Sequence, residues 1–357
     1  MRCAAGHDVT DPLAWRCPDC GAPHDFTDLP PFDPGSIDTG TWSMWRYAAM
    51  LPVKPVVTLG EGATPLVPVH LPGGSFLAKL EHLNPTASYK DRGTSAAVSH
   101  LVTHGADHLV EDSSGNAGAS IAAYAAAAGV TARVYVPATA SAAKLRQIAA
   151  AGADVVPVPG PRSAAYTAAR GDTRGVYASH VWHPAFLLGH RTCAWEIWEQ
   201  HGRRLPAVVA CPVGQGNLFL GLAHGFRALV GAGLAGRMPR MVAVQAAACA
   251  PVAAAWRSGA ADPSTVDERP TVAEGIRTAS PVRGRDLLRV VRSTGGAVLT
   301  VSDAAIGAAQ RDLAAAGLLV EPTGAVAVAA LGELRRRFDA EIAEILVPLT
   351  GSGLKTG

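Results

Sequence analysis

The sequence lacks a long uninterrupted apolar run, a concentration of charge of either sign and a dense set of cysteines. Although 48% of the 357 residues are hydrophobic, Arg, Asp, Gly or Pro interrupts each Ala/Val run before it reaches the ~18 apolar residues of a membrane span. The 31 basic and 29 acidic residues are scattered, which excludes the basic surface of a nucleic-acid or membrane-surface protein. Six cysteines are too few for a disulfide framework.

The first residues also lack the basic start and apolar segment of a signal peptide. We therefore expect a cytoplasmic protein that binds neither nucleic acid nor membranes. Its length is about twice that of a typical domain, which predicts two lobes with a sizeable core. Lysine is scarce as well: five of the 31 basic residues are lysine, at positions 54, 79, 90, 144 and 355.

Residues 1–27 hold a small cluster of metal-binding residue types. The Cys17-Pro-Asp-Cys20 turn presents two thiolates to one metal ion, which is half of a tetrahedral zinc site. The candidate ligand set is Cys3, His7, Cys17 and Cys20, and His24 is a weaker candidate. One interpretation is a zinc-ribbon-like arm; the other is a degenerate ribbon that has lost its metal and is held by packing alone.

Residues 28–57 are rich in proline and aromatics, which favours an extended linker arm. From about residue 58, strand-like runs alternate with Ala-rich segments of helical length. The strand-like runs are 76–81, 108–112, 132–137, 154–158, 207–212, 241–246, 297–301 and 344–349. The clearest helical segments are 95–105, 117–129, 142–152 and 220–233. This alternation predicts an α/β fold with open, mainly parallel sheets and helices on both faces.

In such sheets, ligands bind where the loops leave the carboxyl ends of the strands, and four of these loops are unusual. The first, residues 84–93, places Lys90 at a predicted helix start, where the helix dipole and Arg92 both disfavour an added positive charge. An amine discouraged from protonation is a nucleophile that can form a Schiff base with an aldehyde. Taken alone, such a lysine is more often a solvated ion pair.

The second loop, Ser113-Ser114-Gly115, opens an Ala-rich helix. Its hydroxyls and backbone N–H groups at a helix N-terminus make an anion site suited to a carboxylate. An ordinary serine cap followed by a glycine turn is the alternative.

The third loop contains Gly214 and Gly216, which allow the backbone to approach a phosphate at the start of the next helix. It lacks the Lys-Ser/Thr of a nucleoside-triphosphate loop and an acidic residue at ribose spacing, so it indicates a monophosphate. In the fourth loop, Thr350 follows the last strand, where its hydroxyl would face the crevice. An aldehyde for the lysine, a monophosphate for the glycines and a pyridine nitrogen for the hydroxyl together describe pyridoxal 5′-phosphate.

These motifs resemble those of threonine synthase and its relatives, which are fold type II pyridoxal-phosphate enzymes of the tryptophan synthase β family. The matching segments are 59–66, 84–93, 113–118, 214–217, 321–325 and 349–355. The resemblance covers about residues 58–355, and a ribbon-like N-terminus also occurs in bacterial members. It implies a two-lobed fold of open twisted sheets and an amino-acid substrate, and we expect a homodimer.

The domain boundaries that we expect are an arm at 1–27, a linker at 28–57, a large cofactor-binding lobe at 58–100 and 185–357, and a smaller mobile lobe at 101–184. The resemblance further implies that Lys90 binds the cofactor covalently and later moves protons. Asn116 would bind the ring hydroxyl of the cofactor, and Thr350 would face its ring nitrogen. The phosphate would be held by Val213, Gly214, Gln215, Gly216 and Asn217. The substrate carboxylate would be bound by Ser113, Ser114 and Gly115.

A hydroxyl at position 350, in place of a carboxylate, leaves the ring nitrogen neutral and makes the ring a weaker electron sink. Such a cofactor favours removal of the α-proton followed by loss of a β- or γ-substituent, rather than transamination. The reaction class is therefore elimination or replacement.

The substrate depends on residues 180–192, where threonine synthases bind the phosphate of O-phosphohomoserine. The phosphate-binding Asn, Ser and Arg of those enzymes correspond here to His180, Val181 and Phe186. Phe offers nothing in exchange for the bidentate fork of Arg. Either the phosphate is met by His180, His183 or Arg191, or the leaving group is not phosphate.

Three hypotheses follow. The first is conversion of O-phosphohomoserine and water to threonine and phosphate. The second is β-elimination or β-replacement on serine, threonine or an O-activated serine. The third is a cofactor-binding regulatory protein without turnover, with the arm as an interaction module.

Overall fold

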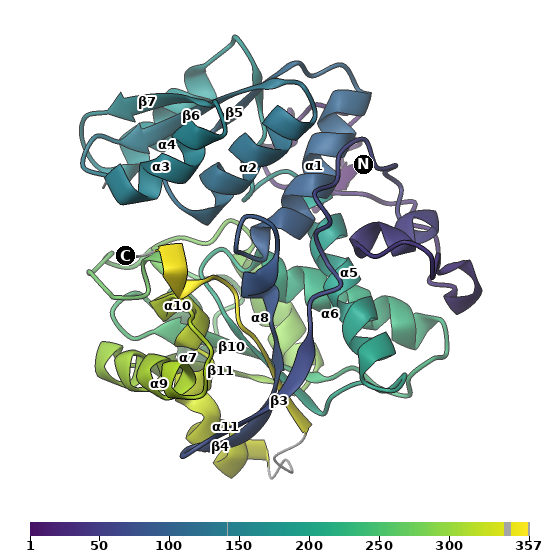
Figure 1. The fold of residues 1–357 in the computed structure, drawn as a ribbon, viewed down its shortest axis with the longest axis vertical. Helices are drawn as coiled ribbons and strands as arrows, with labels where there is room; N and C mark the ends of the chain where they lie inside the picture. Colours follow the sequence, from purple (N-terminus) through teal and green to yellow (C-terminus); the bar gives the residue numbers. More distant parts are fainter. Residues whose placement is uncertain (141, 339–343, 356–357) are drawn as a thin grey trace. The chain divides into compact units, whose positions relative to one another are not determined.

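The computed structural model describes residues 1–140, 142–338 and 344–355, and the chain divides into two compact units (Figure 1). Unit 1 comprises Met1–Ala63, Asn84–His190 and Lys355–Gly357. Unit 2 comprises Thr64–Leu83 and Arg191–Leu354. Each unit is built on its own sheet, which is parallel in unit 1 and mainly parallel in unit 2.

Unit 1 contains a four-stranded parallel sheet with the strand order β7-β6-β5-β8. Its strands are β5 (His108–Glu111), β6 (Thr131–Pro137), β7 (Asp154–Val158) and β8 (Val176–Tyr177). Its helices are α1 (Lys90–Thr103), α2 (Asn116–Ala127), α3 (Ala142–Ala150) and α4 (Arg162–Gly171), and α5 (Ala185–Gln200) begins here and continues into unit 2. The alternation of strand and helix is that of βαβ units.

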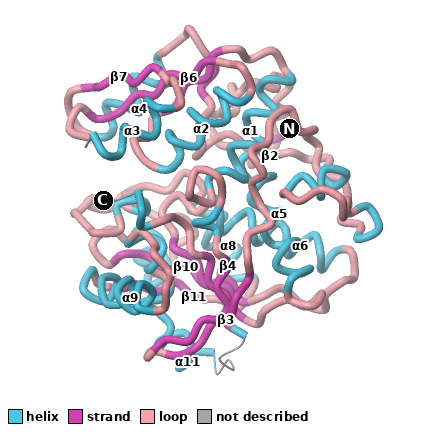
Figure 2. Tube along the Cα trace, viewed as in Figure 1, coloured by secondary structure: helices cyan, strands magenta, loops and turns pink. Residues whose placement is uncertain are grey.

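Helices cover both faces of this sheet because successive side chains of a strand point to opposite sides. Val134 and Val136 of β6 pack with the apolar residues of α2 and α3. Tyr135, between them, packs with Ala165 and Ala169 of α4 on the other face. Both faces of the sheet are therefore apolar and covered by helices. Figure 2 shows α2, α3 and α4 close to β6 and β7.

Two glycines allow close packing around α1 and α2. A Cβ atom on Gly118 would lie 1.9 Å from the carbonyl oxygen of Ser113, and one on Gly189 would lie 1.8 Å from that of Arg92. No side chain fits at these distances, so the absence of a Cβ lets α2 approach the loop after β5 and lets α5 approach α1.

The N-terminal residues of unit 1 contain little regular structure. β1 (Arg2–Cys3) pairs with β2 (His24–Asp25), and short 3-10 helices occur at η1 (Pro34–Ser36) and η2 (Met44–Met50). The sequence favours an extended arm over 28–57, yet η2 buries Met44, Trp45, Tyr47 and Met50. The indole Nε1 of Trp45 donates to the hydroxyl of Ser95 at 2.9 Å, which attaches this segment to α1.

Unit 2 contains a six-stranded sheet with the order β11-β10-β9-β12-β4-β3, parallel except for the antiparallel pair β3 and β4. The strands are β3 (Leu66–Leu71), β4 (Gly74–Lys79), β9 (Val208–Pro212), β10 (Arg240–Ala246), β11 (Ala297–Val301) and β12 (Ile345–Pro348). The α-helices are α6 (Asn217–Gly231), α7 (Pro251–Ser258), α8 (Gly284–Ser293), α9 (Asp303–Ala315), α10 (Pro322–Ala325) and α11 (Leu331–Phe338). Short 3-10 helices are η3 (Glu81–Leu83), η4 (Glu274–Ile276) and η5 (Val328–Ala330). A further one, η7 (Gly353–Lys355), begins in unit 2 and has its last residue, Lys355, in unit 1.

The core of unit 2 lies between this sheet and α9 to α11. Val208 and Ala210 of β9 share a buried cluster with Leu313 of α9 and Leu334 of α11. Beneath the antiparallel edge, the buried ammonium of Lys79 pairs with the carboxylate of Glu196. A buried charge without its partner would cost several kcal/mol, so the fold of unit 2 must keep Lys79 and Glu196 together.

The structure confirms the α/β fold and all eight strand-like runs, which form β4 to β7 and β9 to β12. Beyond residues 1–57, it adds β3 and β8, which the sequence does not predict. The four helical segments also form, as α1, α2, α3 and α6, with ends shifted by a few residues. The six cysteines are free, and Cys193, Cys211 and Cys249 are buried, where a free thiol packs as a small apolar group.

The predicted domain boundaries remain a prediction. The compact units group residues 84–190 together, because α1 and α5 pack with the rest of unit 1. Within the described residues, no helix is both long enough and apolar enough to span a membrane.

Candidate active site

The loop before α1 is held by the buried carboxylate of Asp91. The backbone N–H and the hydroxyl of Thr86 donate to it at 2.6 and 2.5 Å, and the hydroxyl of Ser120 on α2 donates at 2.6 Å. Burial raises the pKa of Asp91 to about 6, against the opposing effect of these hydrogen bonds. Lys90, the neighbour of Asp91, is the first residue of α1, as predicted, and its Nζ lies 4.7 Å from the centre of the Tyr89 ring.

Ser113, Ser114 and Gly115 lie between β5 and α2, also as predicted. Ser113 and Ser114 are half-buried, and the Ser113 hydroxyl accepts from the N–H of Gly115 at 3.2 Å. Asn116 is the first residue of α2, and its Oδ1 accepts from Lys355 Nζ at 2.9 Å. In the part of the chain that the structure describes, no side chain caps α2, and its first turn holds no acidic residue. Its N–H groups therefore suit an added carboxylate.

His180 is held by a buried carboxylate at the end of β5. Its Nδ1 lies 2.9 Å from Oε1 of Glu111, and its backbone N–H donates to Oε2 at 3.3 Å. Burial lowers the pKa of His180 well below 6.5, with a further contribution from the Lys90 ammonium, and burial raises the pKa of Glu111. The surroundings of this pair thus disfavour the cationic imidazole that would neutralise a phosphate.

Phe186 occupies a buried position against α1. Its ring and that of His190 fill the space beside Gly93, where a Cβ atom would lie 2.4 Å from each. Among the described residues, neither ring nitrogen of His190 has a hydrogen-bond partner. Burial lowers the pKa of His190 well below 6.5, with the Lys90 ammonium as the next cause. His190 therefore belongs to the surroundings of Lys90, although the sequence did not identify it.

His183 lies in a different cluster of unit 1. Its ring centre is 5.4 Å from that of His100, and burial lowers its pKa well below 6.5, with His100 and His24 adding to the effect. His100 Nε2 contacts the carbonyl oxygen of Pro12 at 2.9 Å, so this cluster also holds the N-terminal arm. The substrate-binding role that the sequence suggests for His183 stays a prediction.

In unit 2, the loop from Val213 to Asn217 connects β9 to α6. Gly216 has φ of +84°, and a Cβ atom there would lie 2.4 Å from Leu287, so glycine is required. A Cβ atom on Gly214 would lie 2.8 Å from Cα of Ile276, a backbone approach that only glycine allows. Gln215 Oε1 accepts from the N–H of Val282 at 3.0 Å, which connects the middle residue of the loop to the segment before α8.

Thr350 follows β12, the neighbour of β9 in the sheet. The two strands are parallel, with Leu346 opposite Val209, so Thr350 falls level with Val213 at the same carboxyl edge. Its side chain is buried, and within residues 1–140, 142–338 and 344–355 its Oγ1 has no hydrogen-bond partner. A buried hydroxyl without a partner is costly unless a ligand supplies one.

The residues therefore fit pyridoxal phosphate in each unit separately. Unit 2 offers a glycine loop for the phosphate, at a helix N-terminus that no side chain caps within the described residues, and a buried hydroxyl for the ring nitrogen. Unit 1 offers the lysine, the amide of Asn116 and an uncapped helix for a carboxylate.

The four cysteine and histidine candidates in the N-terminal arm lie together. Sγ of Cys3 is 3.7 Å from Sγ of Cys20, Sγ of Cys17 is 3.6 Å from Nδ1 of His7, and the four ligand atoms lie within 4.8 Å of one another. A tetrahedral zinc ion with Zn–S bonds of about 2.3 Å places its ligands about 3.8 Å apart. This donor set thus fits zinc, whereas the weaker candidate His24 lies outside it.

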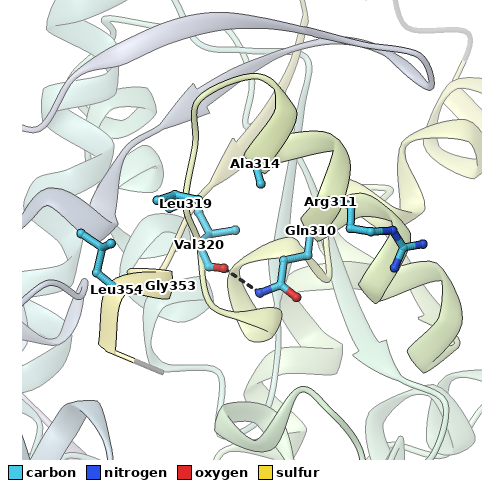
Figure 3. Close-up of a pocket in the computed structure, with 7 residues that line it drawn as sticks. All are labelled: Gln310, Arg311, Ala314, Leu319, Val320, Gly353 and Leu354. Carbon is cyan, nitrogen blue, oxygen red and sulfur yellow. Dashed lines mark hydrogen bonds between the residues drawn. The ribbon is translucent and has the colours of Figure 1, made fainter. Parts of the chain in front are cut away.

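A cavity of about 250 Å³ opens in unit 2 beside α9 (Figure 3). Arg311, Leu319 and Leu354 are among its lining residues, and the Gln310 amide donates to the carbonyl oxygen of Val320 at 2.9 Å. None of the predicted cofactor residues lines it, so it is not the site of the chemistry described above.

The sequence missed several members of these clusters, namely Glu111, His190, Asp91 and Lys355. Asp91 and Lys355 lie within two of the motifs, and Glu111 lies near the end of a strand-like run, so the position of each residue in the sequence was a signal. The sequence did not indicate which residues they contact, because partners such as Lys355 and Asn116 are 239 residues apart in the chain.

Comparison with known proteins gives one family and many similar enzymes. The profile of the family described as pyridoxal-phosphate dependent enzyme matches residues 57–351. The chain is 31% identical over 348 residues to the threonine synthase of Methanosarcina acetivorans, covering 94% of this chain and 85% of the relative. It is 33% identical over 325 residues to that of Methanocaldococcus jannaschii, covering 87% of this chain and 80% of the relative.

Among solved structures, a threonine deaminase from T.th. is 29% identical with a TM-score of 0.69, covering 81% of this chain and 92% of that chain. An L-serine ammonia-lyase from Rhizomucor miehei, 24% identical, has a TM-score of 0.71 and covers 82% of this chain and 94% of that chain. This second likeness concerns the fold alone.

The buried histidine cluster predicts a loss of stability in acid. Because the pKa of His183 is lowered in the folded state, the unfolded chain takes up the proton first, and stability falls as the pH drops below 6.5. Each such histidine contributes about 1.4 kcal/mol per pH unit below that value. Urea unfolding of wild type at pH 7.5 and 5.5 should show a lower free energy of unfolding at pH 5.5. In His183→Asn, the difference between the two pH values should be smaller by about 1 kcal/mol.

The exposed His108 supplies the control, since His108→Asn should leave the pH dependence of wild type in place. If the stability of His183→Asn falls between pH 7.5 and 5.5 as steeply as that of wild type, the conclusion that His183 is buried and neutral in the folded protein is wrong.

Proposed function

Since the chain belongs to the family of pyridoxal-phosphate dependent enzymes, we propose that it converts O-phosphohomoserine and water to threonine and phosphate. The proposal rests on the similarity to threonine synthases over most of the chain. One observation of the structure carries it: the glycine loop and the unpartnered Thr350 hydroxyl stand level at one sheet edge.

When bound, pyridoxal phosphate supplies an electron-poor ring that accepts the charge left on the α-carbon after proton loss. The N–H groups of residues 214–217 and the positive end of α6 would bind its phosphate. The Thr350 hydroxyl would donate to its ring nitrogen, and a hydroxyl, unlike a carboxylate, leaves that nitrogen without a full positive charge. This choice favours elimination and replacement over transamination.

Lys90 is the proposed catalytic residue. Its Nζ would bind the aldehyde of the cofactor and then, once the substrate amine has displaced it, take the proton from the α-carbon. The uncapped N-terminus of α2, with Ser113 and Ser114, would hold the substrate carboxylate and so orient the α-hydrogen toward Lys90. Asn116 would bind the ring hydroxyl.

The leaving group separates two candidate functions, and one observation favours the second. Phe186 is buried where threonine synthases carry a phosphate-binding Arg, and burial disfavours the charged form of His180 by lowering its pKa. A neutral imidazole suits a hydroxyl leaving group better than a phosphate. β-Elimination on serine or threonine, or β-replacement on an O-activated serine, is therefore the second candidate, and the likeness to a threonine deaminase agrees with it.

The two functions are separated by their products. With O-phosphohomoserine, the first proposal expects threonine and inorganic phosphate in equal amounts. The second expects a 2-oxo acid from serine or threonine and no phosphate release. Lys90→Met should lower either activity by about 10²–10⁴-fold, whereas Lys54→Met, a change at an exposed lysine, should leave it unchanged.

A protein that binds pyridoxal phosphate and turns over none of these substrates would instead support the regulatory hypothesis. The cytoplasmic location and the homodimer expected from the sequence stay predictions.

We also propose that the N-terminal arm holds one zinc ion through Cys3, His7, Cys17 and Cys20. The distances among these ligand atoms support the proposal. Carbonyl and N–H contacts of the Cys3 and Cys17 turns would orient the thiolates, since Gly6 and Gly21 donate to their carbonyl oxygens at 3.0 and 2.9 Å.

Metal analysis tests this arm directly. Wild type should contain about one zinc per chain, Cys17→Ser should lose it, and the matched Cys249→Ser, at a buried cysteine of unit 2, should keep it. Wild-type protein purified with zinc but free of bound metal would show that the arm is a degenerate ribbon.

A further inference from the structure

Trp15 of the N-terminal arm packs against the segment that contains His180. Its indole makes edge-to-face contacts with Tyr177 and Trp182, with ring centres 5.3 Å apart in both pairs and the rings inclined by 82° and 84°. This geometry is favourable for aromatic side chains. Tyr177 and Trp182 stand on either side of His180 in the chain, so one side chain of the arm contacts both ends of residues 177–182.

Residues 177–182 depend on such contacts because the sheet holds them weakly. β8 has two residues and forms an edge of the sheet, where it pairs with Leu109 and Val110 of β5. A strand this short makes few backbone hydrogen bonds with its neighbour. Its position is therefore decided largely by the packing of its side chains.

A hydrogen-bond network connects Tyr177 to His180. The Tyr177 hydroxyl donates to Oδ1 of Asp112 at 2.7 Å, and Arg162 of α4 pairs with Oδ2 at 2.8 Å. The backbone N–H of Asp112 donates at 2.9 Å to Oε1 of Glu111, which is the oxygen that His180 Nδ1 contacts. A displacement of Tyr177 would therefore disturb the carboxylates that hold the imidazole.

The ring of Trp15 is itself held in place. The guanidinium groups of Arg16 and Arg170 lie 4.5 and 5.0 Å from its centre. Such contacts are attractive because the face of an indole ring carries partial negative charge. The ring also packs against the apolar cluster that contains Tyr135 and Ala165. Trp15 thus extends the apolar packing of unit 1, although it belongs to the arm.

The arm is attached on both sides of Trp15. On one side, the carbonyl oxygen of Pro12 contacts His100 Nε2 at 2.9 Å. On the other side, Cys17 is buried within the candidate zinc site. The loop between these two points is short, so its ends limit where the indole can lie.

We propose that Trp15 is a positioning residue, which holds residues 177–182 on β5 and so keeps His180 in place beside the leaving group of the substrate. The inference rests on the proposed function, in which His180 lies near that group. Trp15 itself makes no proposed contact with substrate or cofactor, and its effect passes through Tyr177 and Trp182. The arm thereby acts on substrate binding, beyond its proposed zinc site.

Hydrogen exchange of the cofactor-free protein tests the packing. In Trp15→Ala, the amides of residues 177–182 should exchange about tenfold faster than in wild type, because the segment opens more easily. The amides of α2 and of residues 213–217 should exchange as in wild type. Trp15→Phe, which keeps an aromatic ring, should restore most of the protection.

Steady-state kinetics test the consequence for the substrate. With whichever of O-phosphohomoserine, serine and threonine the wild type turns over, Trp15→Ala should raise KM about tenfold and change kcat less than about threefold, because the loosened segment must be ordered each time the substrate binds. The affinity for pyridoxal phosphate should be unchanged, since residues 177–182 contain no proposed cofactor-binding residue. Trp15→Phe should restore most of the wild-type KM.

Trp42 supplies the matched control. It is another tryptophan of the N-terminal residues, it is 77% exposed, and Trp42→Ala should leave the exchange pattern and KM of wild type unchanged. Zinc content should be the same in Trp15→Ala and wild type, because Trp15 is not a candidate ligand. Loss of zinc in Trp15→Ala would show that the effect passes through the metal site, against the proposal.

Three results would overturn the proposal: exchange of residues 177–182 as slow in Trp15→Ala as in wild type, a uniform increase of exchange over unit 1, which indicates a merely structural role, or an unchanged KM beside faster exchange. Trp15→Leu replaces Trp15→Ala if that variant does not fold, and it should show smaller effects of the same sign. A wild-type protein that turns over none of these substrates would instead refute the proposed function, and the exchange comparison would still decide whether Trp15 holds the segment.

Discussion

The buried carboxylate of Asp91 is the constraint on which the lysine loop depends. It accepts from Thr86 on its own loop and from Ser120 on α2, so the loop and the helix are fixed to one acceptor. Its burial would be costly without these donors, which favours the loop conformation that supplies them. Lys90, the preceding residue, therefore starts α1 at a defined place. The amine that the proposed chemistry needs is thus placed by the carboxylate of the next residue.

A second constraint acts in unit 2, where the register of two neighbouring strands positions the candidate cofactor-binding residues. Because β9 and β12 are parallel neighbours, the loops that leave them end at one edge, and Thr350 stands level with Val213. The loop requires glycine at positions 214 and 216, because Ile276 and Leu287 fill the space that Cβ atoms would occupy. Backbone N–H groups and one buried hydroxyl are thereby presented together. Each unit thus carries groups that have a use only when a ligand is bound.

Much of this could be predicted from the sequence, because the signals were local. The eight strand-like runs, the glycine loop and the helix start at Lys90 follow from composition and periodicity within about ten residues. The strands β3 and β8 were not predicted. Pro68 interrupts the strand pattern of β3, and β8 has only two residues. The pairing of Lys355 with Asn116 and of His180 with Glu111 could not be predicted, since spacing along the chain does not record contacts made by the fold. The substrate could not be predicted for the same reason, because the sequence shows Phe186 in place of Arg but not which residues surround it in the fold.

The central claim is that a cofactor aldehyde is bound by Lys90, and its attachment site can be read chemically. Borohydride reduction of the protein loaded with pyridoxal phosphate converts the Schiff base to a stable secondary amine, and peptide mapping by mass spectrometry then locates it. The account predicts the added mass on the peptide that contains Lys90. The same mass on a peptide carrying Lys54, Lys79, Lys144 or Lys355 instead, or on none, would contradict it.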